Sequence, residues 1–157
     1  MIYRVAFRKI IEVNFADIKI KRDEYFRDFY EKELNIQNDI VDDILNNPEN
    51  YRFINCIFNV KNTSNKLRIV GLKIEPNFTK DLKEIILWYD KNPGVAPIVI
   101  EPLKEREIKM QIFIKFNNLN NNDIEKMLSE SHFKVSGITG NSIFNIGYDS
   151  IIIKYQN

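Results

Sequence analysis

Alternating hydrophobic and polar positions run through most of this 157-residue chain and predict a protein built mainly of β-strands. The clearest example is Glu107–Phe116, where every second residue is apolar and Phe113 alone interrupts the polar side. Tyr51–Lys61 alternates in the same way and leads through an Asn-rich turn to a second strand that ends at Pro76. That second strand covers residues 67–75, and further strands are predicted over residues 1–20, 98–100, 133–138 and 142–155.

The strand pattern changes phase in two places. The first twenty residues read as two strands, or as one long bent strand with a bulge. In the segment 67–75 the apolar positions switch sides, which predicts a bulge at Val70-Gly71.

Residues 82–89 fit both a helix and a strand. We favour a strand, because a buried strand can be apolar on both faces.

Two further segments have helical spacing. Asp23 is placed to cap a helix that carries Phe26, Phe29 and Tyr30 and ends near Asn35. A second helix follows over 36–45, so that the helical insertion spans about 23–47. A short helix is expected over about 122–129, with Asn122 and Glu125 forming a capping box.

These elements predict a mainly β protein: an antiparallel sandwich with a helical insertion and one short helix. We expect a single domain over 1–157, in which 1–50 hold the N-terminal strands and the insertion and 51–157 form the sandwich. The core is predicted to contain Phe58, Ile69, Ile98, Ile112, Ile114 and Ile151.

Part of the sandwich region resembles a known kind of domain. Phe58–Ile69 (FNVKNTSNKLRI), Pro97–Glu105 and Tyr148–Ile153 resemble the strand-and-turn pattern of immunoglobulin-like sandwiches in bacterial proteins. Leu103 stands where that pattern has a glycine. The resemblance covers about 51–157 and is to accessory or binding domains of bacterial or phage proteins. It implies a binding role by analogy of fold alone.

Composition narrows the function classes. The chain has 23 basic and 22 acidic residues, so it lacks the large basic excess of a dedicated nucleic-acid binder. Its abundant Ile, Lys and Asn have AT-rich codons and indicate a bacterial or phage origin. No apolar run is long enough to span a membrane, and charged residues interrupt the N-terminus where a secretory signal would lie. We therefore expect a cytoplasmic protein.

The sequence offers little catalytic chemistry. A single His and a single Cys cannot make an ordinary zinc site, and five Gly leave no phosphate-binding loop. Cys56 alternates with apolar neighbours and is expected to be a buried strand residue. We predict no catalytic, metal-binding or cofactor-binding residues, and no enzyme activity.

Two groups of residues are candidates for binding. Aromatic residues crowd the first predicted helix, and Tyr25, Phe29 and Tyr30 are the candidate partner-binding residues, because exposed aromatics flanked by charge are typical of binding hot spots. If the first two segments pair, basic residues would form one patch that could contact phosphates. That candidate patch consists of Arg4, Arg8, Lys19, Lys21 and Arg22.

The leading hypothesis is a non-enzymatic protein-binding module, a small subunit or an inhibitor that acts by occluding or scaffolding a surface. One alternative is a nucleic-acid-contacting protein that uses the basic patch. Another is a carbohydrate-binding sandwich with Trp88 and Tyr89 as a stacking platform. The partner, the pathway, a homo-oligomer and the exposure of the aromatic helix stay open.

Overall fold

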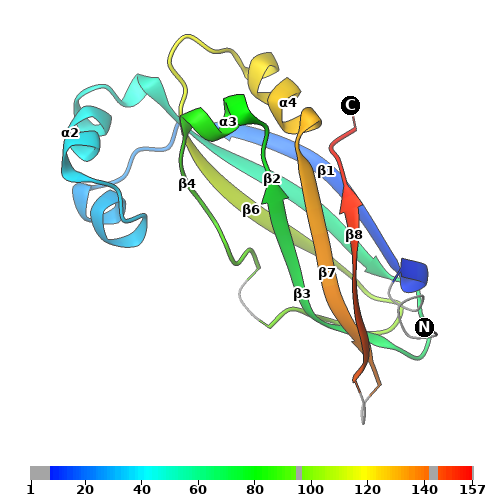
Figure 1. The fold of residues 1–157 in the computed structure, drawn as a ribbon. Helices are drawn as coiled ribbons and strands as arrows, with labels where there is room; N and C mark the ends of the chain where they lie inside the picture. The colour runs from blue at the N-terminus through cyan, green and yellow to red at the C-terminus, as the bar shows by residue number, and fades with distance from the viewer. Residues whose placement is uncertain (1–7, 95–96, 142–144, 157) are drawn as a thin grey trace.

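The computed structural model describes residues 8–94, 97–141 and 145–156. In these ranges the chain forms two four-stranded antiparallel sheets that face each other as a β-sandwich (Figure 1). Sheet A has the strand order β1–β2–β6–β4, and sheet B has the order β5–β3–β7–β8. The strands are β1 (Ile11–Lys21), β2 (Tyr51–Asn62), β3 (Arg68–Asn77), β4 (Ile86–Tyr89), β5 (Val99–Ile100), β6 (Glu105–Lys115), β7 (His132–Gly140) and β8 (Asn145–Ile153).

Short helices interrupt the strands at three places. The insertion between β1 and β2 contains η1 (Phe29–Glu33), α2 (Asn38–Asn46) and η2 (Pro48–Asn50), while α3 (Lys80–Ile85) and α4 (Asn121–Glu130) lie at one end of the sandwich (Figure 1). The predicted mainly β sandwich with a helical insertion is confirmed, and α4 lies at the predicted short helix near 122–129, whereas α3 was not predicted.

The capping box of α4 lies two residues earlier than predicted. The side chain of Asn120 accepts a hydrogen bond from the Asp123 backbone N–H at 3.0 Å, and the Asp123 carboxylate accepts one from the Asn120 N–H at 2.9 Å. The predicted pair of Asn122 and Glu125 was therefore wrong, because the loop ends one helical half-turn sooner and Asn120 takes the capping position.

The inner faces of the two sheets enclose the main core. Five of the six predicted core residues are at most 2 % exposed, and Ile151 is partly buried against them. Cys56 is fully buried in β2, as predicted, and its burial raises the pKa of the thiol. The alternation read from the sequence thus selects the inner faces correctly.

The N-terminal region forms one long strand. β1 pairs with β2 along its whole length, and its register shifts between Phe15 and Asp17. This bulge explains why the apolar residues change side midway along the strand. Residues 8–10 form a helical turn, and residues 1–7 of the predicted first strand lie outside the described residues. Since β1 belongs to sheet A, placing the whole sandwich in 51–157 was wrong.

The second predicted bulge is confirmed. The register of β3 against β7 shifts between Val70 and Lys73, and Gly71 has a φ of 62°, a conformation that suits glycine. The ambiguous segment 82–89 contains both structures, since α3 ends at Ile85 and β4 begins at Ile86. Our preference for a strand was wrong for residues 82–85.

A second hydrophobic cluster lies on the outer face of sheet A. Phe53 and Phe113 are at most 1 % exposed, and their rings stack with centroids 4.4 Å apart. They are cross-strand neighbours on the face opposite the main core. The helical insertion covers them and contributes most of the remaining buried residues, which are Tyr30, Leu34, Ile36, Val41 and Ile44.

A buried amide holds the turn between β2 and β3. Asn62 is fully buried, and its amide nitrogen donates to the carbonyls of Leu67 at 2.8 Å and Ile100 at 3.0 Å. Its amide oxygen accepts from the Ser64 N–H at 3.0 Å. All three bonds are made inside the protein, so one side chain ties the turn to β5.

Replacing Asn62 should therefore destabilise the sandwich. We expect Asn62→Ala to lower the free energy of unfolding by about 2 kcal/mol, because buried backbone groups lose their partners. Urea denaturation followed by tryptophan fluorescence measures this change. Asn59→Ala on the exposed side of the same strand is the matched control, and an equal loss in both variants would contradict the assignment.

Candidate partner-binding surface

The aromatic stretch begins in an extended segment and enters a helix later than predicted. Helical structure starts at Arg27, and no side chain caps it, so the predicted cap at Asp23 was wrong. Within η1 the Leu34 N–H donates to the Phe29 carbonyl five residues earlier at 3.1 Å. This π-helical turn rotates the side chains relative to an α-helix, and π-turns are frequent at functional sites. Asn35 ends the turn, as predicted, with a φ of 53°.

The turn divides the aromatic residues into a buried anchor and an exposed patch. Tyr30 is 2 % exposed and packs its ring against Phe113, so assigning it to partner binding was wrong. Its hydroxyl accepts a hydrogen bond from the Tyr25 N–H at 3.1 Å. This bond fixes the chain that leads into the turn, which positions Tyr25.

Tyr25, Phe26 and Phe29 form what we call the aromatic patch. The Tyr25 and Phe29 rings stack with centroids 4.1 Å apart, and Tyr25 also meets Phe53 edge-on at 5.4 Å. Tyr25 is 39 % exposed and Phe29 is half-buried. Phe26 is 90 % exposed, the highest value among the exposed large hydrophobic side chains. The patch therefore presents one free ring beside a stacked pair that rests on the second cluster.

Phe26 was not among the predicted site residues. The available signal was the crowding of four aromatic residues within Tyr25–Tyr30, which is more than one helix face can bury. In an α-helix, Phe26 and Tyr30 would lie on the same face, because they are four residues apart. In the structure the helix starts only at Arg27 and contains a π-turn, so the two side chains point in different directions. Sequence spacing alone could not supply that rotation.

Ion pairs hold the turn against α2. Arg27 donates to Glu31 at 2.8 Å and also pairs with Asp42 of α2. These hydrogen bonds, chiefly the one to Asp42, raise the pKa of Arg27. Lys32 pairs with Asp28 at 2.7 Å. The guanidinium thus joins the two helical pieces just beside the aromatic patch.

A polar joint connects α2 to sheet A. Asp43 accepts hydrogen bonds from the Tyr51 hydroxyl, from the Asn47 amide at 2.7 Å and from the Lys115 ammonium at 3.2 Å. These bonds, led by the one from Tyr51, lower the pKa of Asp43. Burial and the carboxylate of Asp43 raise the pKa of Tyr51. The insertion is therefore fixed to the sheet by polar as well as apolar contacts.

Charge is unevenly divided between the insertion and the rest of the chain. Residues 23–50 contain nine Asp and Glu but only two Arg and Lys, a net charge of −7. The remainder of the chain carries +8, and the near-zero total conceals this separation. A charge count over sequence windows would have found it, whereas the whole-chain count did not.

The structure does not assemble the predicted basic patch. Arg8 lies before the start of β1 and pairs with Asp149 of β8 at 2.9 Å. Lys21 lies at the other end of β1, about 30 Å away for a strand of this length. Arg22 pairs with Glu24 at 3.2 Å, Lys19 lies 4.0 Å from Asp17, and Arg4 is outside the described residues. One continuous phosphate-binding patch was therefore a wrong expectation.

Trp88 and Tyr89 do not form a shared stacking platform. Trp88 packs against the second cluster on the outer face of sheet A, whereas Tyr89 packs against the main core and meets Phe78 edge-on at 5.3 Å. Neighbouring strand residues point to opposite faces, so the two rings cannot lie side by side under one sugar.

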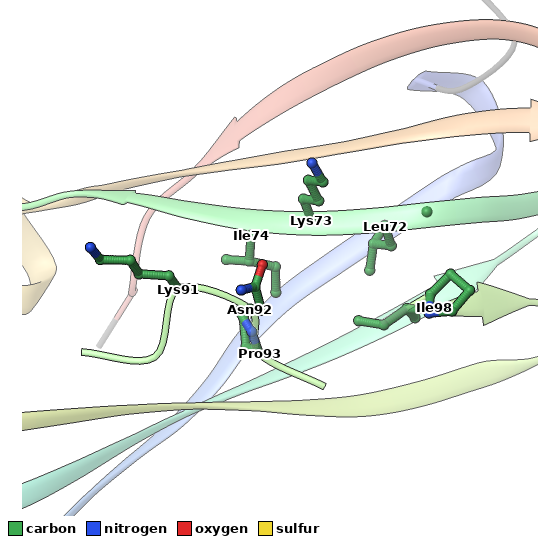
Figure 2. A pocket seen from close by; sticks show the side chains of 9 residues that line it. Leu72, Lys73, Ile74, Lys91, Asn92, Pro93 and Ile98 are labelled. Carbon is green, nitrogen blue, oxygen red and sulfur yellow. The ribbon is translucent and has the colours of Figure 1, made fainter. Parts of the chain in front are cut away.

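A small apolar hollow lies beneath the bulge of β3, with Leu72 and Ile74 directed into it beside Ile98 (Figure 2). Its volume is about 130 Å³, well below that of ordinary ligand pockets. Lys73 points away from it, and Leu72, Ile74 and Ile98 of its wall belong to the main core (Figure 2). Lys91 and Asn92 also line the hollow, so its small volume is the feature that argues against a ligand site.

The hydroxyl of Ser131 has a structural role. Ser131 is buried, donates to the Met127 carbonyl at 2.9 Å and accepts from the Thr79 N–H at 3.2 Å.

In the described part of the chain no three His, Cys, Asp or Glu side chains come together to hold a metal. Among the same residues, no helix is long and apolar enough to cross a bilayer.

Comparison with known proteins gives only remote likenesses. No family model and no curated protein matches the chain. A FixG-related protein from Vibrio parahaemolyticus is 11 % identical, with 92 % of this chain and 94 % of that chain covered and a TM-score of 0.30. The cupredoxin domain of amoB from Nitrosocaldus yellowstonii is 6 % identical, with 95 % and 88 % covered and a TM-score of 0.31. Likenesses at this level say nothing about what the chain does.

The polar joint at Asp43 generates a pH prediction. A carboxylate whose pKa is lowered by folding stabilises the folded state above its unfolded pKa of about 3.9, and this contribution is lost as the pH falls through the folded value. We expect Asp43→Asn to lower the melting temperature at pH 7, and the difference from wild type to shrink below about pH 4.

Differential scanning fluorimetry from pH 2 to pH 8 measures this difference. Asp39→Asn is the matched control, because Asp39 is exposed on the same helix and makes no ion pair with a described residue. A constant difference between wild type and Asp43→Asn across the whole range would contradict the role of the ionised carboxylate.

Proposed function

We propose that the chain is an immunoglobulin-like, non-enzymatic protein-binding module. The strand order supports the fold assignment. Immunoglobulin constant-type domains place strands A, B, E and D in one sheet and C, F and G in the other. Sheet A has this order as β1–β2–β6–β4, and sheet B has it as β3–β7–β8, with β5 added at the edge beside β3.

The binding role rests on one observation: Phe26 is 90 % exposed and lies next to the stacked rings of Tyr25 and Phe29. A free phenylalanine on a surface that is held rigid by stacking and ion pairs can enter a partner's pocket with little loss of conformational freedom. Aromatic side chains at the centre of an interface supply a large share of binding energy. Such a module would act by occluding or scaffolding its partner's surface.

Removing the exposed rings should abolish partner binding without unfolding the protein. We expect the double variant Tyr25→Ala with Phe26→Ala to weaken binding by at least about 2 kcal/mol, the usual size of a hot-spot effect. The measurement is affinity capture from a nuclease-treated lysate of the native organism, with quantitative mass spectrometry.

Tyr148→Ala is the matched control, because Tyr148 is an aromatic residue that is 57 % exposed on β8, far from the insertion. A stoichiometric partner that is lost only with the patch variant supports the proposal. Equal recovery with all three proteins would overturn the role of the patch, and enrichment that disappears with nuclease would favour nucleic acid instead.

A further inference from the structure

We infer that the surface recognised by the aromatic patch is a positively charged protein surface, in which Lys or Arg side chains surround an apolar hollow. This inference rests on the proposed function and specifies the chemistry of the partner. It is argued from charge complementarity between the insertion and whatever covers Phe26.

The insertion that carries the patch has an excess of free carboxylates. The two basic residues of the insertion are already used, since Arg27 pairs with Glu31 and Asp42, and Lys32 pairs with Asp28. Exposed carboxylates remain that make no ion pair with any described residue. They are Asp23, Glu33, Asp39 and Glu49.

Two of these carboxylates belong to the stretch of chain that carries the patch. Asp23 lies two residues before the patch, and Glu33 lies at the end of the π-turn that carries Phe29. A partner that buries Phe26 must therefore approach the carboxylate of Asp23, three residues away along the chain, and Glu33 belongs to the same π-turn as Phe29 of the patch. An acidic or uncharged partner would face like charges or desolvate carboxylates without compensation, whereas Lys or Arg would pair with them.

The charge of the insertion also distinguishes between classes of partner. Nucleic acid is polyanionic and is disfavoured by the insertion, because residues 23–50 carry a net charge of −7. A basic protein surface matches both the exposed Phe26 ring and the unpaired carboxylates. Its apolar hollow would bind the ring, and its Lys or Arg side chains would pair with the carboxylates. The separated charges would also steer the two proteins together, an effect that salt weakens.

The test is a titration of the ¹⁵N-labelled full-length protein with a synthetic amphipathic helix made of Lys and Leu. An otherwise identical Glu and Leu peptide and a Lys and Ser peptide are the matched probes. We expect amide shifts in residues 23–50 with the Lys and Leu peptide only. Raising NaCl from about 0.1 M to about 1 M shortens the Debye length from about 10 Å to about 3 Å and should weaken this binding about tenfold or more.

Two variants separate the charge inference from the proposed function. Asp23→Lys with Glu33→Lys should weaken binding of the Lys and Leu peptide about tenfold, while Phe26→Ala should weaken it without changing its salt dependence. Glu84→Lys with Glu107→Lys on the sandwich makes the same change in net charge and should leave binding unchanged, because these exposed carboxylates lie outside the insertion.

Each of the other possible outcomes contradicts the basic partner, the binding patch or both. If Phe26→Ala reduces binding but the charge reversal does not, the basic partner is wrong and the binding patch survives. If neither variant changes it, both proposals fail. Equal shifts with the Glu and Leu peptide overturn the charge argument. Self-association in analytical ultracentrifugation that Asp23→Lys with Glu33→Lys abolishes would identify the occupant as a second copy of this chain instead.

Discussion

The stacked pair of Phe53 and Phe113 is the constraint on which the rest of the structure depends. A sheet in a sandwich has one face for the core and one for water, yet these two rings lie on the outer face and are fully buried. Exposing a pair of this size would cost several kcal/mol and invite aggregation. Another part of the chain must cover it, and the insertion between β1 and β2 does so. The insertion is therefore a second layer of the protein and a second core.

Covering the pair also sets what the insertion can present to solvent. Tyr30 turns inward onto Phe113, and its hydroxyl fixes the backbone of Tyr25. With the inward side filled, the remaining rings of the stretch stay outside, and Phe26 is left almost fully exposed. Polar contacts at Asp43 and Arg27 then hold the insertion in place, and residues 23–50 carry a net charge opposite in sign to that of the rest of the chain. Packing and electrostatics thus converge on one surface.

Much of the sandwich could be predicted from the sequence, because period-two alternation reports which side of a strand is buried. It located the core strands, and the phase changes located both bulges. The interruption at Phe113 was the visible sign of the second core, but alternation cannot say which segment covers an apolar outer position. The exposed residues of the candidate site were harder to predict, for a related reason. Exposure of Tyr25, Phe26 and Tyr30 depends on a π-turn and on a hydrogen bond between residues five apart, and neither has a sequence signature. The basic patch failed because it assumed two short strands, and one long strand separates its members instead.

The most direct test of this account is residue-resolved hydrogen exchange of Phe113→Leu against Ile112→Val, two conservative changes on opposite faces of β6. The account predicts that Phe113→Leu lowers the protection of amides in residues 27–46 more than that of amides in β3 and β7, because it loosens the second core. Ile112→Val lies in the main core and should lower protection across both sheets, by about 1 kcal/mol. If Phe113→Leu reduced protection equally throughout, or left the insertion unchanged, the aromatic pair would not be what holds the proposed binding surface in place.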